Sequence, residues 1–182
     1  MKQTNLIIIA AVLIFLYGCF LPVLRRAMPE GGVKIPVIFT GQKDDSLCGE
    51  ACAEMIVNFY GKKIGKRGQD IMETEAKKSG GIKAGTIKNI LDNCGLKTAV
   101  FPGSPDEQET GIFRHLKSGR PLIALISPAP EMAGHYIVLS GYEPDTEKLI
   151  VQDPENGTAQ MDYERFLKLW ENSKFLTVLA IP

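Results

Sequence analysis

The spacing of the apolar residues changes from a helical to a strand-like pattern along this chain of 182 residues. In residues 48–59 and 87–94 the apolar positions recur every three or four residues, as on the buried face of a helix. From Pro121 onward, short β-rich runs alternate with turn residues, and one amphipathic helix, from Tyr163 to Trp170, precedes the last run. Helices followed by an antiparallel sheet predict an α+β domain.

The same patterns place the individual elements. Gly61 and Gly95 are positioned to end the helices that begin near Cys48 and near Ile87. We expect helices at residues 48–59, 68–79, 87–94, 106–117 and 163–170. We expect strands at residues 33–39, 96–101, 121–126, 135–142, 148–152 and 175–181.

An apolar segment from Leu6 to Leu24 precedes this domain. It reaches the roughly 20 residues that a helix needs to span a bilayer, so we predict one apolar helix and a signal anchor or lipoprotein signal at residues 1–27. The residues around Cys19 resemble a bacterial lipobox, in which that cysteine would be lipidated. Residues 28–34 are expected to be a linker and residues 35–182 the folded domain. Both interpretations place the protein at a membrane of the bacterial cell envelope.

Charge and cysteine usage exclude several other classes of protein. Lysine plus arginine and aspartate plus glutamate number 21 each, so no broad basic field exists to attract nucleic acid. The four cysteines, at positions 19, 48, 52 and 94, form no CxxC pair and have no accompanying histidine pair. We therefore expect neither a nucleic-acid partner nor a structural zinc site.

Cys48 has the placement of a reactive thiol. It begins a predicted helix, and the free N–H groups and dipole at a helix N-terminus stabilise a thiolate. The alternative is a small buried apolar residue, which is the interpretation we favour for Cys52 and Cys94 inside their apolar stripes. Cys48 is thus the candidate nucleophile.

A cysteine nucleophile needs a histidine as its base, and this chain has two. His135 opens a predicted strand directly after Gly134, which would hold its ring in a fixed position. His115 is expected on the polar face of a helix. Asp153 ends the next predicted strand, and a hairpin turning near Pro144 would return it alongside His135, where it could orient the imidazole.

Gln42 is the candidate donor to an oxyanion. It lies six residues before Cys48, at the end of a predicted loop, where its side-chain amide could act together with the backbone N–H of Cys48. The alternative is an ordinary amide on a surface loop.

These segments together resemble a known family. Residues 42–51, beginning with Gln42 and containing Cys48-Gly49, are similar to the glutamine-to-cysteine segment of the double-glycine leader peptidases, the bacteriocin-processing peptidases. Gly134-His135-Tyr136 and Asp153-Pro154 resemble that family's histidine and aspartate segments, in the same order. The resemblance implies a papain-like fold, a triad of Cys48, His135 and Asp153, and Gln42 at the oxyanion hole. It also implies that no metal or organic cofactor is needed.

The family's well-known members are fused to an ABC exporter. This chain contains no Walker A loop, so we expect no ATP-binding domain and a closer likeness to stand-alone, membrane-anchored relatives. The expected function is hydrolysis of a peptide bond in a peptide or protein substrate through a thioester on Cys48. Cleavage after a double-glycine leader is implied by the resemblance alone.

Two other functions are compatible with the same residues. One is a catalytically silent module that binds a peptide, although such a module has no need of all four candidate residues. The other is a different thiol acyl-transfer enzyme, such as an amidase or a transglutaminase-like protein, because the same chemistry serves all these acyl donors. Gly31-Gly32 is a flexible linker or, alternatively, a site of self-processing.

Overall fold

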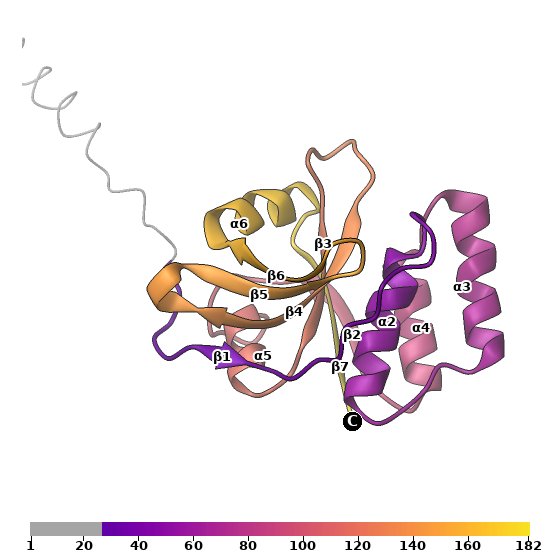
Figure 1. Ribbon diagram of the computed structural model, residues 1–182, viewed down its shortest axis with the longest axis horizontal. Helices are drawn as coiled ribbons and strands as arrows, with labels where there is room; N and C mark the ends of the chain where they lie inside the picture. The colour runs from indigo at the N-terminus through magenta and orange to yellow at the C-terminus, as the bar shows by residue number, and fades with distance from the viewer. Residues whose placement is uncertain (1–26) are drawn as a thin grey trace, which may run out of the picture.

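The computed structural model describes residues 27–182, which contain helices and an antiparallel sheet (Figure 1). The helices are α2 (Cys48–Phe59), α3 (Lys66–Ser79), α4 (Ala84–Asn93), α5 (Ile112–Lys117) and α6 (Tyr163–Asn172). The strands are β1 (Val33–Lys34), β2 (Lys97–Pro102), β3 (Leu122–Ile126), β4 (His135–Glu143), β5 (Lys148–Asp153), β6 (Gly157–Asp162) and β7 (Leu176–Ile181). Helices α2, α3 and α4 lie together beside the sheet, and helices α5 and α6 pack on the strands (Figure 1). The predicted α+β class is confirmed.

The predicted N-terminal apolar helix and the candidate lipidation site, Cys19, lie outside the described residues. Within residues 27–182, no helix has the length and apolar character that crossing a bilayer requires.

The described strands form one antiparallel sheet in the order β2-β7-β3-β4-β5-β6, and β1 pairs with β4. The central strands β3 and β4 are buried along most of their length, and their apolar runs account for this. The hairpin between β4 and β5 turns through a short 3-10 helix at Pro144–Thr146. The first residue of β4 and the last residue of β5 therefore meet at the same end of the sheet.

Helix α2 packs between strand β4 and helix α4. Cys52, Met55 and Ile56 project from its inner face and are at most 1% exposed. Their spacing of three and four residues produces one continuous apolar stripe, which the sheet and α4 cover. The N-terminal end of α2 is consequently fixed against the strand that carries His135.

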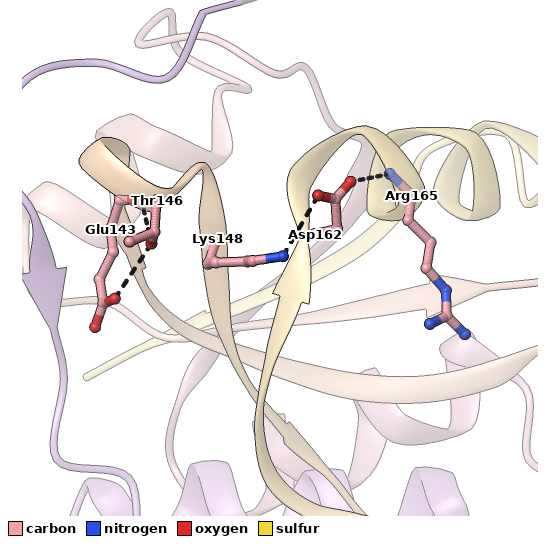
Figure 2. A network of polar contacts seen from close by, with 5 residues as sticks. All are labelled: Glu143, Thr146, Lys148, Asp162 and Arg165. Carbon is pink, nitrogen blue, oxygen red and sulfur yellow. Dashed lines mark hydrogen bonds and ion pairs between the residues drawn. The ribbon is translucent and has the colours of Figure 1, made fainter.

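The opposite end of the β4–β5 hairpin is held by a polar network around Asp162 (Figure 2). Asp162 caps α6, because its Oδ1 accepts a hydrogen bond from the N–H of Arg165 at 3.1 Å. Its Oδ2 lies 3.5 Å from Nζ of Lys148, at the start of β5. This network joins β5, β6 and α6 at the end of the hairpin away from His135.

Two predicted elements are shorter than expected. The strand predicted at residues 33–39 ends at Lys34, and only the N–H of Ile35, 2.7 Å from the carbonyl oxygen of Ser140, extends the pairing. Pro36 follows and has no N–H to donate to the ladder. The helix predicted from Asp106 begins only at Ile112, because the Asp106 carboxylate accepts bonds from Ser104 and Gln108 and forms a turn instead.

Two further expectations were wrong. Strand β6 was missed because its residues, Gly157–Asp162, are mostly polar and lie at the edge of the sheet, paired only with β5 among the described strands. His115 does not lie on a polar face: it is 6% exposed, and its Nε2 lies 3.1 Å from the carbonyl oxygen of Glu109. The other helices and strands begin and end within about three residues of the predicted positions.

Candidate active site

Cys48 is the first residue of α2 and is 6% exposed. The backbone N–H groups of Gly49 and Tyr136 and the imidazole of His135 lie close enough to its thiol to lower the pKa, against the effect of burial. Backbone N–H groups at a helix N-terminus have no partner within the helix, so they are free to stabilise a negative charge there. The local sequence therefore produces a pocket suited to a thiolate.

Gly49 allows this close packing. A Cβ atom at this position would lie 3.1 Å from Cδ1 of Ile87, 3.2 Å from Cβ of Ile82 and 3.3 Å from Cδ2 of Tyr136. These distances are shorter than ordinary van der Waals contacts. Glycine thus lets the N-terminal end of α2 approach both α4 and the strand that carries the histidine.

His135 and Asp153 are brought together by the pairing of β4 with β5. Nε2 of His135 lies 2.7 Å from Oδ1 of Asp153, although the two residues are 18 positions apart. The turn at Pro144–Thr146 produces this arrangement, as the hairpin prediction required. Since Asp153 occupies Nε2, Nδ1 is the ring nitrogen left to face Cys48.

Asp153 is held by two more donors from the turn that follows it. Its Oδ1 accepts the N–H of Glu155 at 3.0 Å, and its Oδ2 accepts Nδ2 of Asn156 at 2.9 Å. Burial raises the pKa of Asp153, but the bonds from Asn156, His135 and Glu155 outweigh it and lower the pKa below its ordinary value. The carboxylate is therefore ionised and fixed in orientation.

The electrostatics of Cys48 and His135 are complementary. Burial raises the pKa of the thiol, while the hydrogen bond from His135 and the two backbone N–H groups lower it, with a net decrease. Burial of His135 also disfavours the charged form and lowers its pKa, but the interactions with Cys48 and Asp153 outweigh burial and raise that pKa to about 9. Between the lowered pKa of the thiol and the raised pKa of the imidazole, the arrangement favours a thiolate beside an imidazolium.

Gln42 lies in the loop before α2, and its N–H donates to the carbonyl oxygen of Pro154 at 3.0 Å. With Leu47, Glu50 and Ala51 it lines a small cavity beside the first turn of α2. Among the described residues, no hydrogen bond joins the Gln42 side chain to Cys48, and its buried Oε1 has no protein partner. The structure thus places Gln42 next to the start of α2, between that helix and the turn after Asp153.

Sequence reasoning missed several residues that support this site. Asn156 holds Asp153, and its place in an Asn-Gly turn was the available signal. Lys43 and Glu50 form an ion pair beside Gln42 that no motif indicated. Behind the site, a buried network joins Gln152 to Ser140 at 3.1 Å and to Thr158 at 2.5 Å, which fixes the register of β4, β5 and β6.

The remaining candidates are not part of this cluster. His115 is buried, with its ring centroid 6.3 Å from that of Phe101, and burial lowers its pKa. Cys52 is fully buried, and burial raises the pKa of its thiol well above the ordinary value. Cys94, expected in the core, is only partly buried, and its thiol donates to the carbonyl oxygen of Lys63 at 3.5 Å. Within residues 27–182, no cluster of His, Cys, Asp and Glu has the arrangement of a metal site.

Comparisons with known proteins place this arrangement in a family. The Peptidase_C39 like family matches residues 34–178, a range that includes Gln42, Cys48, His135 and Asp153. No curated protein matches the chain.

Solved structures share the fold. The peptidase domain of Streptococcus ComA, a bifunctional ABC transporter of a quorum-sensing pathway, has a TM-score of 0.64 at 21% identity over 80% of this chain and 98% of its own. A C39-like peptidase from Bacillus anthracis has a TM-score of 0.67 at 16% identity over 84% of this chain and 98% of its own. A double-glycine-motif protease from an AMS/PCAT transporter, solved with a leader peptide, has a TM-score of 0.61 at 18% identity over 85% of this chain and 96% of its own. With the match over residues 34–178, the chain belongs to the Peptidase_C39 like family.

Proposed function

We propose that this protein is a cysteine peptidase that hydrolyses a peptide bond through a thioester on Cys48. The observation that carries the proposal is the continuous chain of contacts from Cys48 through His135 to Asp153. A thiol, an imidazole and a carboxylate in this order are the groups that nucleophilic acyl transfer requires. The C39-like family assignment supports the same activity.

The Cys48 thiolate attacks the carbonyl carbon of the scissile bond, and the electrons of the C=O bond move onto oxygen. The Cys48 backbone N–H and the Gln42 amide are the proposed donors to this oxyanion. As the tetrahedral intermediate collapses, Nδ1 of His135 gives its proton to the departing amine, and the thioester remains.

Water then completes the reaction. Neutral His135 takes a proton from a water molecule that attacks the thioester carbonyl, and the carboxylic acid product leaves as the C–S bond breaks. The thiolate and the imidazolium are restored together. Asp153 stabilises the imidazolium and keeps the ring in one orientation throughout, without itself gaining a proton.

The proposed substrate is a peptide or protein with a double-glycine leader. The support for this finer proposal is the family match, together with the related protease whose structure holds a leader peptide. Attachment to a bacterial membrane through residues 1–27 is also part of the proposal and is supported by the apolar sequence from Leu6 to Leu24.

The test compares the wild-type chain with Cys48→Ala and with Cys94→Ala, the partly exposed cysteine outside the site. Each is incubated with peptides containing Gly-Gly, with the same peptides containing Ala-Ala, and with simple primary amides, and products are identified by mass spectrometry. Cleavage of Gly-Gly peptides that is lost only in Cys48→Ala supports the proposal. Binding without cleavage by every variant would establish the silent module instead, and turnover of amides alone would establish an amidase.

The natural substrate can be sought in parallel. Peptides from bacterial cells that carry wild-type protein are compared with those from cells that carry Cys48→Ala. A cleavage product present only with the wild type identifies both the substrate and the bond that is cut.

A further inference from the structure

We propose that the ion pair between Lys43 and Glu50 is a clamp that positions Gln42 opposite Cys48. This inference rests on the proposed peptidase function. Lys43 directly follows Gln42, and Glu50 lies two residues after Cys48 in the first turn of α2. Nζ of Lys43 and Oε1 of Glu50 are 3.0 Å apart, so the pair joins the residue next to one candidate catalytic group to the helix that carries the other.

Glu50 is an unusual residue for this position because its side chain is only 4% exposed. Its Oε1 binds Lys43, and its buried Oε2 has no hydrogen-bond partner among the described residues. A carboxylate is rarely buried unless a cation compensates its charge. Lys43, whose side chain is 60% exposed, provides that charge from the surface. The pair therefore holds Lys43, and with it the adjacent backbone, against α2.

A second contact holds the same loop from the other side. The N–H of Gln42 donates to the carbonyl oxygen of Pro154, in the turn that follows Asp153. After Ile35 the loop has no strand partner until α2 begins at Cys48. Gln42 is thus held by two contacts. The bond to Pro154 connects it to the turn after Asp153, and the Lys43–Glu50 pair connects it to the helix that begins at Cys48.

This placement matters because an oxyanion donor acts only from the correct position. A displacement of about 1 Å can reduce a rate by about a hundredfold. The buried Oε1 of Gln42 has no hydrogen-bond partner among the described residues, so this amide depends on its backbone for placement. Lys43 and Glu50 are therefore positioning residues, which act through Gln42 rather than on the substrate.

The decisive variant is Lys43→Met combined with Glu50→Gln. It removes the clamp without leaving an unpaired charge near Cys48. We expect kcat to fall about tenfold, while the pH dependence of Cys48 alkylation by iodoacetamide stays that of the wild type, because alkylation develops no oxyanion. In a Gln42→Ala background the same pair of substitutions should change kcat less than about twofold, because the residue that they position is already absent.

Three controls accompany it. Lys43→Arg retains the ion pair and should keep kcat within about twofold of the wild type. Lys66→Met breaks a surface pair with Asp70 on α3, whose two side chains are 76% and 56% exposed, and should leave kcat unchanged. Thermal melting of every variant identifies any loss of the fold.

The two proposals fail in different ways. If only the clamp proposal is wrong, the wild type still turns over peptides. The Lys43→Met/Glu50→Gln variant then either has the kcat of the wild type, or its substitutions lower kcat by the same factor whether Gln42 is present or replaced by alanine. If the peptidase proposal is wrong, the wild type itself cleaves no peptide. In that case the affinity for a peptide aldehyde, which forms an oxyanion on Cys48 without turnover, still tests the clamp. An unchanged affinity in the clamp variant would then overturn it.

Discussion

Cys48 and His135 form the ion pair on which the proposed chemistry depends, and the pair defines a pH range. His135 is protonated below its pKa of about 9, and the Cys48 thiol is ionised above its lowered pKa. Between these limits the thiolate and the imidazolium coexist. Because the two groups interact strongly, a titration reports the pair rather than either residue alone.

We expect Cys48 to react with a small alkylating agent at about pH 5.5, where ordinary thiols are almost wholly protonated. Cys52 should not react, because it is buried and its pKa is raised. Cys94 is partly accessible, but burial raises its pKa too, so it should react only in alkaline solution. Peptide mapping after brief alkylation measures all three sites in one experiment.

His135→Ala should abolish the labelling of Cys48 in mild acid, because the thiolate loses its cationic partner. Labelling should return as the pH rises toward 8.5, the value of a free thiol. His115→Ala is the matched control, since that ring is outside the site, and labelling should be unaffected. Preferential modification of Cys52 or Cys94, or no response to His135→Ala, would refute the assignment of the nucleophile.

Asp153→Asn should preserve the fold and lower kcat by several orders of magnitude, up to about 10⁴-fold, because the amide does not stabilise the imidazolium and can hold the wrong tautomer. The comparison is Asp145→Asn, in the turn at the other end of the hairpin, which should be nearly silent. Steady-state kinetics on a cleaved peptide measures both. If Asp145→Asn abolished activity and Asp153→Asn did not, the assignment of Asp153 as the orienting residue would be wrong.

At the scale of elements, helix α2 and strands β3, β4, β5 and β7 could be predicted because their apolar residues follow a clear period. Strand β6 could not, since an edge strand exposed to solvent carries no such pattern. The burial of His115 was equally hidden, because it depends on how α5 packs against the sheet. The contact between His135 and Asp153 could be predicted from the hairpin that pairs their strands. The Lys43–Glu50 pair could not, because it joins a loop to a helix and no periodic pattern in the sequence indicates it.

Gly49→Ala tests the packing at the start of α2. The added methyl group would press on Ile87, Ile82 and Tyr136, so we expect a loss of about 1–3 kcal/mol in the free energy of unfolding. Alanine keeps the backbone N–H that helps to lower the pKa of Cys48, so acid-range labelling of Cys48 should weaken only if the added methyl group displaces the start of α2. Gly85→Ala in α4 is the control: apart from its chain neighbours and the backbone of its own helix, no atom lies within 4 Å of the added Cβ, and stability should stay equal or rise by up to about 1 kcal/mol. Equal stability of the two variants in urea denaturation would contradict the packing interpretation.

At the scale of the whole molecule, the sheet separates Gly31-Gly32 from the candidate active site. Strand β1 starts at Val33, which pairs with Tyr142 near the end of β4. His135 is at the other end of this nine-residue strand. Seven residues of extended chain span about 24 Å, so the pair of glycines and the thiol belong to opposite ends of the sheet.

We therefore expect that a chain does not cleave its own Gly32–Val33 bond, because β1 would first have to separate from β4 and carry this segment past the length of the strand. Mass spectrometry of the purified full chain should show an intact linker at low protein concentration. If one molecule cuts another, a new N-terminus at Val33 should form at a rate that rises with concentration, and Cys48→Ala protein should be cut when wild-type protein is added. A Val33 terminus that forms in dilute wild-type protein at a rate independent of concentration, and never in Cys48→Ala, would show that β1 leaves the sheet and reaches the thiol of its own chain.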